Sequence, residues 1–261
     1  MIELRNVSLT LRSEGNEFRI KNVDMMLKEE KAVIIGPNGS GKTTLIKAIA
    51  GLIPYDGEIF IDGMELRKIR GFLEFSTNLP EAYKIAISVK DTLKLLVGLK
   101  GVDEEVFYDF LKRLNINPQE LIRKPLHSLS AGQSVIVRTA LALSSKPRII
   151  LLDEPFENVD PARRLIIVEM IREYGKEGLI ATHELDILKK VPNYKAYIMI
   201  EGALYGPVKV EDLLNSSIVE GEQKEAILTI EVLKRKYSII KERGGIKFGE
   251  LGSLNRLYGV L

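Results

Sequence analysis

Gly36-Pro37-Asn38-Gly39-Ser40-Gly41-Lys42-Thr43-Thr44 is the stretch that decides the fold of this chain. It matches the phosphate-binding pattern G-x-x-x-x-G-K-[ST], which needs a strand before it and a helix after it. The apolar run Ala32-Val33-Ile34-Ile35 precedes it, and the helical pattern Leu45-Ile46-Lys47-Ala48-Ile49-Ala50 follows it. Glycines let backbone N–H groups approach phosphate oxygens, and the helix directs its positive end toward the same anion. The sequence therefore predicts a nucleotide phosphate site over residues 36–44.

Two side chains of this loop have expected roles in that site. Lys42 is expected to reach the β- and γ-phosphates, and the Thr43 hydroxyl is expected to ligate Mg²⁺. A glycine-rich turn without a ligand is the alternative interpretation. The strand and the helix on either side favour the phosphate site.

Composition excludes several classes of protein. The 261 residues include 38 Lys and Arg against 36 Asp and Glu, so the net charge is +2 and no nucleic-acid partner is expected. No apolar stretch approaches the roughly 18 residues of a membrane span, and the first residues lack the pattern of a signal peptide. The chain has no Cys, which excludes disulfides and thiolate metal sites. We expect a cytoplasmic protein.

The order of patterns predicts an α/β fold. Strands are predicted at residues 2–11, 18–27, 58–63, 72–75, 149–152, 179–182, 196–200 and 226–232. Helices are predicted at residues 45–50, 88–99, 103–114, 161–174, 185–191 and 211–214, with two more opening at 117 and after 133. This order implies a P-loop NTPase with a doubly wound, mostly parallel sheet, an N-terminal antiparallel β-subdomain and an inserted helical subdomain over about 79–145. The predicted domain covers residues 1–206, and residues 207–261 form an extension of unknown role.

A second set of chemical groups follows a fully apolar strand. The run Ile149-Ile150-Leu151-Leu152 has the composition of a strand buried on both faces, and it ends in Asp153 and Glu154. Asp153 is expected to bind Mg²⁺ directly or through water. Glu154 can accept a proton from a water aimed at the γ-phosphate. A lone Asp that caps a strand is the alternative.

A third motif is Leu129-Ser130-Ala131-Gly132-Gln133, at the start of a helix rich in Ala and Leu. A Ser hydroxyl and Gly amides at a helix N-terminus can form an anion site. A Ser that only caps its helix is the alternative. The position of the motif, some twenty residues before Asp153, favours the anion site.

In this order, the motifs resemble those of the ATP-binding cassette family, the ATPase subunits of ABC transporters, over roughly residues 1–206. The resemblance also covers Glu157-Asn158-Val159-Asp160, similar to the D-loop, and Ala181-Thr182-His183-Glu184, which carries the switch histidine. It implies ATP hydrolysis with Mg²⁺, and it assigns catalytic roles to Glu154, His183 and Lys42. It also implies that Ser130, Gly132 and Gln133 contact ATP held by an opposite subunit. The alternative for His183 is a partly buried histidine at the end of a strand, without a catalytic role. His127 matches no family motif and is interpreted as structural or solvated.

The resemblance implies partners as well. We expect a head-to-tail homodimer, or a heterodimer with a sister ATPase subunit, on a separate transmembrane permease at the inner face of the cell membrane. Apolar side chains near the start of the helical subdomain form the permease groove in one interpretation and pack inside the subdomain in the other. They are Leu79, Tyr83, Ile85 and Ile87.

The chain departs from the family at three places. The family's glutamine after the strand at 72–75 is missing from Phe75-Ser76-Thr77-Asn78-Leu79-Pro80. Asn78 or a nearby hydroxyl is the candidate in this stretch for a contact to Mg²⁺ or the water. No aromatic residue occupies residues 11–13, where one usually stacks on adenine. Phe18 is the nearest candidate, and the favoured alternative is that Phe18 is a core residue of its strand. Ala131 replaces the first glycine of the family's signature motif, which corresponds to residues 129–133 here.

Two other functions stay open at this point. A non-transport cassette ATPase that acts as an assembly switch would carry the same motifs. A small-molecule kinase would explain the phosphate loop but leaves the signature and His183 unexplained.

Overall fold

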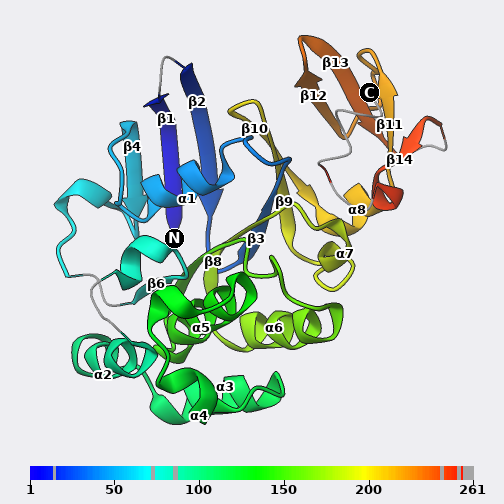
Figure 1. Cartoon of the computed structure of the whole chain (residues 1–261). Helices are drawn as coiled ribbons and strands as arrows, with labels where there is room; N and C mark the ends of the chain where they lie inside the picture. Colours follow the sequence, from blue (N-terminus) through cyan, green and yellow to red (C-terminus); the bar gives the residue numbers. More distant parts are fainter. Residues whose placement is uncertain (14–15, 72–73, 85–87, 242–243, 252–253, 255–261) are drawn as a thin grey trace. The chain divides into compact units, whose positions relative to one another are not determined.

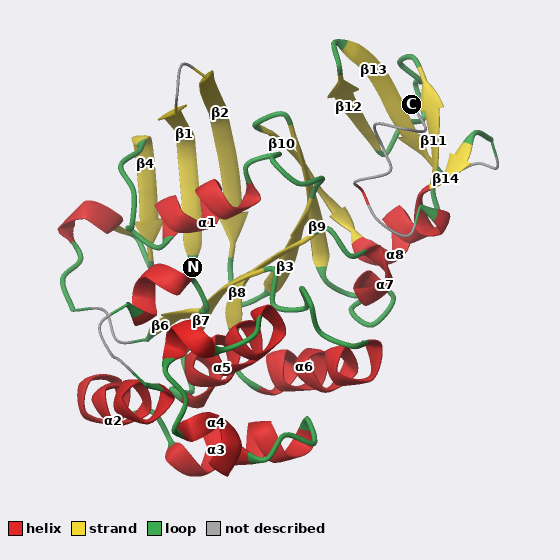
Figure 2. Ribbon diagram, viewed as in Figure 1, coloured by secondary structure: helices red, strands yellow, loops and turns green. Residues whose placement is uncertain are grey.

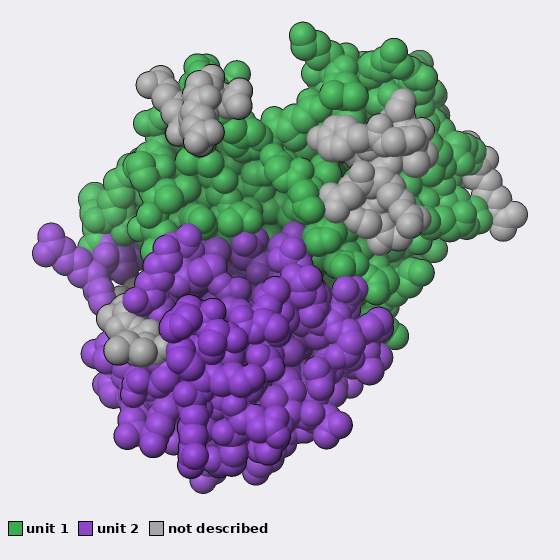
Figure 3. Space-filling view, in the orientation of Figure 1, with its two compact units in different colours: residues 1–68, 181–261 green, residues 69–180 purple. Residues whose placement is uncertain are grey.

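The computed structural model describes residues 1–13, 16–71, 74–84, 88–241, 244–251 and 254. The chain forms two compact units, which Figure 3 colours separately. The first unit contains both ends of the chain, residues 1–68 and 181–261. The second unit is the continuous middle, residues 69–180.

The N-terminal part of the first unit is an antiparallel sheet with the strand order β2-β1-β4-β5 (Figure 1). Its strands are β1 (Ile2–Ser13), β2 (Asn16–Leu27), β4 (Asp56–Ile61) and β5 (Met64–Glu65). Ile2 and Leu4 of β1 are buried while Glu3 and Arg5 are less so, as expected for a strand with one face on the core. The predicted β-subdomain is confirmed.

Strands of the first unit also pair in parallel around the phosphate loop. β3 (Lys31–Ile35) pairs in parallel with β9 (Lys195–Ile200), and β9 pairs antiparallel with β10 (Ala203–Lys209). The last four residues of β3 are fully buried, which explains their unbroken apolar run. The helices of this region are α1 (Lys42–Ile49), α7 (Leu185–Leu188) and η1 (Leu66–Lys68), a 3₁₀ turn.

The C-terminal part of the first unit is a second antiparallel sheet, with the order β12-β13-β11-β14 (Figure 1). Its strands are β11 (Ser217–Glu220), β12 (Leu228–Val232), β13 (Arg235–Ile240) and β14 (Ile246–Lys247). It is flanked by α8 (Val210–Leu214) and by the 3₁₀ helix η4 (Phe248–Glu250). The sequence predicted α8 and β12, but it did not predict this sheet.

The second unit combines a parallel strand pair with helices, which Figure 2 shows in red. β6 (Phe75–Thr77) pairs in parallel with β7 (Ile149–Asp153). The α-helices are α2 (Val89–Lys100), α3 (Glu104–Arg113), α4 (Pro118–Ile122), α5 (Ala131–Ser144) and α6 (Pro161–Glu173). Two 3₁₀ helices are η2 (Pro80–Tyr83) and η3 (Leu126–Ser128). The strand β8 (Glu177–Thr182) crosses the division between the units.

Capping side chains explain where the helices of the second unit begin. Ser88, Asp103 and Asn117 each accept hydrogen bonds from backbone N–H groups in the first turns of α2, α3 and α4. Each satisfies donors that the helix itself leaves unpaired. The predicted starts of these three helices are therefore confirmed.

Several predicted boundaries differ from the observed ones. The strand expected at 72–75 begins only at Phe75 and runs to Thr77, and Phe72 and Leu73 lie outside the described residues. The helix expected at 185–191 ends at Leu188. The predicted α/β class is confirmed by the parallel pairs and the antiparallel N-terminal sheet. The division of the chain at residue 206 stays a prediction.

Candidate nucleotide site

The phosphate loop connects the buried strand β3 to α1, as its motif requires. Gly41 is the N-cap of α1 and has a φ of 110°. The Lys42 side chain folds back over the loop, where its Nζ donates to the carbonyl oxygens of Gly36 at 2.7 Å and Pro37 at 3.1 Å. The ammonium group is therefore buried within the loop and held beside the backbone that is expected to surround the phosphates.

The phosphate loop packs closely on β9 and carries a buried hydroxyl. A Cβ atom on Gly36 would overlap the carbonyl oxygen of Met199, so only glycine fits there. The Ser40 hydroxyl is buried, and within the described ranges it has no hydrogen-bond partner. Buried hydroxyls nearly always have a partner, so this one fits a bound group that offers oxygen acceptors.

Phe18 lies beside the loop. It is half-buried on β2, and its Cε1 atom would lie 3.1 Å from a Cβ atom placed on Gly41. The partial burial of Phe18 is compatible with both interpretations, a core strand residue and an adenine platform.

Asp153 is the last residue of β7 in the second unit, and Glu154 follows it. Residues 149–152 are fully buried, whereas both carboxylates are partly exposed. Glu154 has a φ of 42°, in the left-handed region that non-glycine residues rarely adopt. Such a conformation costs on the order of 1–3 kcal/mol and persists where the surrounding structure holds it.

Asn78 supplies part of that support. Its Oδ1 accepts from the Asp153 N–H at 2.8 Å, and its Nδ2 donates to the Asp153 carbonyl at 3.0 Å. The same Nδ2 donates to the hydroxyl of Thr139 on α5 at 3.3 Å. Asn78 is only 2 % exposed. The residue near the expected glutamine position therefore holds the backbone that carries the two carboxylates.

Asn78→Ala should lower the free energy of unfolding by about 2–4 kcal/mol, because it leaves buried backbone groups of Asp153 without a partner. Chemical denaturation followed by circular dichroism measures this loss. Asn117→Ala is the matched control, since it removes an exposed helix cap and should cost about 1 kcal/mol. Equal losses in the two variants would contradict the assigned role of Asn78.

The signature motif begins α5. The Ser130 hydroxyl accepts from the Gln133 N–H at 3.2 Å, and the Gln133 side chain accepts from the Ser130 N–H at 3.3 Å. This capping box fixes the first turn of α5. Gly132 packs against the D-loop so closely that a Cβ atom there would overlap the Asn158 carbonyl oxygen.

These residues line a polar pocket of about 340 Å³ within the second unit. Its walls include Ser130, Gly132, Gln133 and Asp160. Arg163, which the sequence analysis missed, also lines it and forms an ion pair with Asp160 at 3.3 Å. The sequence around Arg163 gave one sign of this contact, because Arg163 lies three residues after Asp160, the N-cap of α6.

His183 follows β8 in the first unit. The Glu184 N–H donates to the Thr182 hydroxyl at 3.1 Å, which shapes the turn into α7. The His183 side chain is 14 % exposed, and its Nε2 lies 3.9 Å from Glu184 Oε1. The other histidine, His127, is exposed, as the solvated interpretation predicted.

A model of the ABC transporter family matches residues 20–157, which is more than half of the chain. The chain belongs to the ABC transporter family. Its fold and motif order agree with the resemblance seen in the sequence.

Relatives and solved structures support this membership. The chain is 28 % identical over 234 residues to the lantibiotic transport ATP-binding protein SrtF of Streptococcus pyogenes, covering 84 % of this chain and 98 % of the relative. It is 32 % identical over 192 residues to the energy-coupling factor transporter ATP-binding protein EcfA1 of Thermotoga maritima, covering 69 % and 73 %. A solved structure provisionally assigned as a cobalt transport ATP-binding protein (cbiO-2) is 53 % identical over the whole of both chains, with a TM-score of 0.94.

Membership settles the type of protein. The chain is an ATP-binding subunit of an ABC transporter and hydrolyses ATP. This outcome favours the transport interpretation over the assembly switch and the kinase. In the part of the chain that the structure describes, no helix is both long and apolar enough to cross a bilayer.

The second unit of this ABC subunit also has a groove of about 590 Å³ beside η2 and η3. Tyr83, Leu126 and Arg138 line it. Burial raises the pKa of the Tyr83 hydroxyl, which donates to the Thr77 carbonyl at 2.6 Å, and desolvation lowers the pKa of the Arg138 guanidinium. Leu79 is buried, in agreement with the packing interpretation. Ile85 and Ile87 lie outside the described residues.

Proposed function

We propose that two copies of this chain, or the chain and a sister ATPase subunit, close head to tail around two ATP molecules. The observation that carries the proposal is the polar pocket at the start of α5, where Ser130 and Gly132 lie beside the D-loop. A helix N-terminus with a hydroxyl and free amides suits a phosphate. In the family, this element binds the γ-phosphate held by the opposite subunit.

Within one subunit, the phosphate loop residues 36–44 hold the ATP phosphates. Lys42 supplies the positive charge, and Thr43 and Asp153 would hold Mg²⁺. Within the described ranges, no group of three or more His, Asp or Glu forms a metal cage. This fits Mg²⁺, which typically uses one or two protein ligands together with substrate phosphates, and which would neutralise charge on the transferred phosphate.

Glu154 acts as the general base in this scheme. Its carboxylate accepts the proton of the attacking water, and His183 donates a hydrogen bond to the γ-phosphate. Ser130, Gly132 and Gln133 of the opposite subunit complete the contacts to that phosphate. Loss of the γ-phosphate removes what joins the two subunits, so the dimer opens.

The membrane partner is a separate permease, and the protein works at the inner face of the cell membrane. We place the permease contact in the groove lined by Tyr83, Leu126 and Arg138. A groove whose lining combines apolar side chains with a guanidinium suits a short amphipathic segment of a partner. The groove adjoins η2, which begins two residues after Asn78 and therefore connects to the residue that holds Asp153.

Leu126→Arg should abolish co-purification with a polytopic membrane protein from detergent-solubilised membranes of the native host, while ATP binding stays intact. Leu99→Arg is the matched control, because Leu99 is 60 % exposed and lies outside the groove. Affinity pull-down followed by mass spectrometry measures how much membrane protein each variant captures. If wild-type protein captures no membrane protein, the assembly-switch interpretation is favoured. If Leu126→Arg captures it as well as wild type, the groove is not the contact.

A further inference from the structure

Two tight turns of the first unit lie against each other. Glu201 and Gly202 form the turn between β9 and β10, with φ of 49° and 82°. Leu233 and Lys234 form the turn between β12 and β13, with φ of 50° and 65°. Left-handed conformations at both central residues are typical of two-residue hairpin turns, where Asn and Gly are the usual residues. Only Gly202 is such a residue, so local preference alone does not explain these turns.

The Glu201 side chain joins the two turns. The Leu233 N–H lies outside the ladder of β12 and β13, and it donates to Glu201 Oε1 at 3.3 Å. A second contact lies nearby, where the Glu231 N–H of β12 donates to the Tyr205 hydroxyl of β10 at 3.2 Å. The C-terminal sheet β12-β13-β11-β14 is therefore attached to the hairpin of β9 and β10 by two side chains.

The turn between β9 and β10 also holds the phosphate loop. The Gly202 N–H donates to the Ser40 carbonyl at 3.0 Å, and the Lys21 N–H donates to the Gly202 carbonyl at 3.4 Å. A Cβ atom on Gly202 would overlap the Arg19 carbonyl oxygen, so only glycine allows this close approach. One turn thus contacts the C-terminal sheet through Glu201 and the phosphate loop through Gly202.

The orientation of the Ser40 carbonyl matters for binding phosphate. A phosphate-binding loop directs its N–H groups at the anion, so its carbonyl groups must find donors elsewhere. A carbonyl oxygen that turned toward the phosphates would repel their oxygens. The Gly202 N–H provides a donor for Ser40 and so favours the loop conformation that suits the anion.

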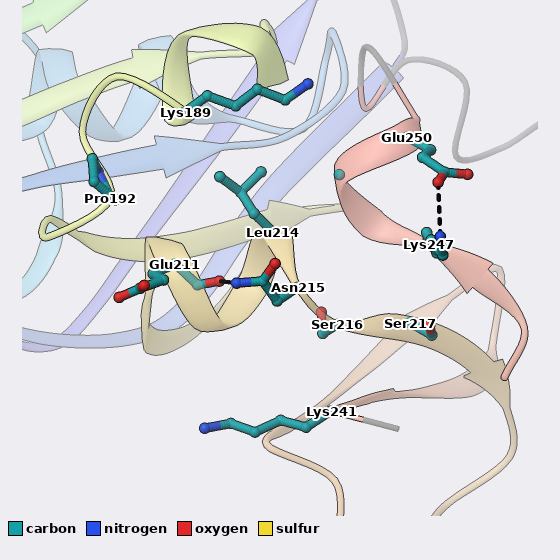
Figure 4. Close-up of a pocket in the computed structure, with 11 residues that line it drawn as sticks. Lys189, Pro192, Glu211, Leu214, Asn215, Ser216, Ser217, Lys241, Lys247 and Glu250 are labelled. Carbon is teal, nitrogen blue, oxygen red and sulfur yellow. Dashed lines mark hydrogen bonds and ion pairs between the residues drawn. The ribbon is translucent and has the colours of Figure 1, made fainter. Parts of the chain in front are cut away.

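The C-terminal sheet is attached to the rest of the first unit at a second place. The Glu211 N–H of α8 donates to the Pro192 carbonyl at 3.1 Å, and the Phe248 N–H of η4 donates to the Ser216 carbonyl at 3.0 Å. Figure 4 shows Pro192, Glu211 and Ser216 around the pocket that they line. Held at both places, the sheet gives the turn between β12 and β13 a defined position against Glu201.

We propose that Glu201 is a positioning residue, which connects the C-terminal sheet to the phosphate loop through Gly202 and so raises the affinity for ATP. This role rests on the proposed function, because it takes residues 36–44 as the ATP phosphate site. Energetic coupling between two sites is reciprocal. ATP bound at the loop should therefore also stabilise the turn between β12 and β13 against opening.

Glu201→Asn tests the connection in the full chain. Asn favours the left-handed turn, but its side chain is one methylene shorter, so Leu233 loses its acceptor. The Kd for AMP-PNP, a nonhydrolysable ATP analogue, should rise about threefold, whereas kcat at saturating ATP should not change. Glu201→Gln retains the Oε1 acceptor at the same reach and should bind as wild type does. Glu225→Asn makes the matched replacement at an exposed residue outside both turns and should also bind normally.

Hydrogen exchange followed by mass spectrometry measures the reciprocal effect. In wild type, AMP-PNP should slow the exchange of residues 228–235 about twofold or more. In Glu201→Asn this slowing should disappear. A merely structural residue would lower the melting temperature when replaced, but it would not make the exchange of this hairpin depend on nucleotide.

The connection is overturned if Glu201→Asn binds AMP-PNP as tightly as wild type, or if AMP-PNP leaves the exchange of residues 228–235 unchanged in wild type. Lys42→Ala separates this result from the proposed function, because its change lies in the phosphate loop itself. If Lys42→Ala binds AMP-PNP as tightly as wild type, the phosphate site of the proposed function is wrong.

Discussion

Glu154→Gln should reduce steady-state ATP hydrolysis by about 10²–10⁴-fold, because an amide cannot accept the proton of the attacking water. The amide has nearly the same shape as the carboxylate, so the left-handed backbone at residue 154 and its support by Asn78 should persist. ATP binding should therefore remain. Because the γ-phosphate is not removed, the variant should accumulate as an ATP-bound dimer, whose mass light scattering would report.

The matched control for this variant is Glu104→Gln, at an exposed carboxylate in the first turn of α3. It makes the same chemical change away from the site and should hydrolyse ATP at the wild-type rate. Normal turnover by Glu154→Gln would remove Glu154 from the role of general base. A slow variant that stays monomeric with ATP would retain the base but contradict the proposed closure.

Gly132→Ala should lower turnover on the order of 10²-fold, the usual cost of losing one well-placed donor to a developing charge. The added methyl group would overlap the Asn158 carbonyl oxygen, so the start of α5 must move away from the D-loop. ATP binding by the chain's own phosphate loop, residues 36–44, should not change, because neither Gly132 nor Asn158 belongs to that loop. Initial-rate assays and nucleotide titrations separate the two effects.

Gly98→Ala provides the control for Gly132→Ala. Gly98 lies on α2, and a Cβ atom there would meet no atom within 4 Å. Alanine is the better helix former, so this variant should be active and at least as stable as wild type. If Gly132→Ala is as active as Gly98→Ala, the close packing of the signature on the D-loop has no part in catalysis.

Local motifs made much of this fold predictable. The phosphate loop, its strand and its helix are contiguous in sequence, so the glycine spacing and the apolar run of β3 were sufficient. Helix starts at Ser88, Asp103 and Asn117 were predicted for the same reason, since a cap acts within one turn. The carboxylates at the end of β7, Asp153 and Glu154, were located because an unbroken apolar run ends there.

Contacts distant in sequence were not predictable in this way. Asn78 forms hydrogen bonds to the backbone of Asp153, which lies 75 residues later. The sequence around either residue gives no sign that the two are in contact. The C-terminal sheet was missed because its strands are short and mix polar with apolar residues, as in Arg235–Ile240. Strand pairing, rather than local propensity, stabilises such segments.

The central claim, that each ATP site is shared by two subunits, is tested most directly by mixing two inactive variants. Lys42→Ala removes the phosphate-loop cation, and Gly132→Ala disturbs the signature. If sites are shared, a mixed dimer pairs the intact loop of one chain with the intact signature of the other. Equal mixing should restore about a quarter of the wild-type ATPase rate, since about half of the dimers are mixed and each has one intact site. No activity above that of the separate variants would contradict the shared site.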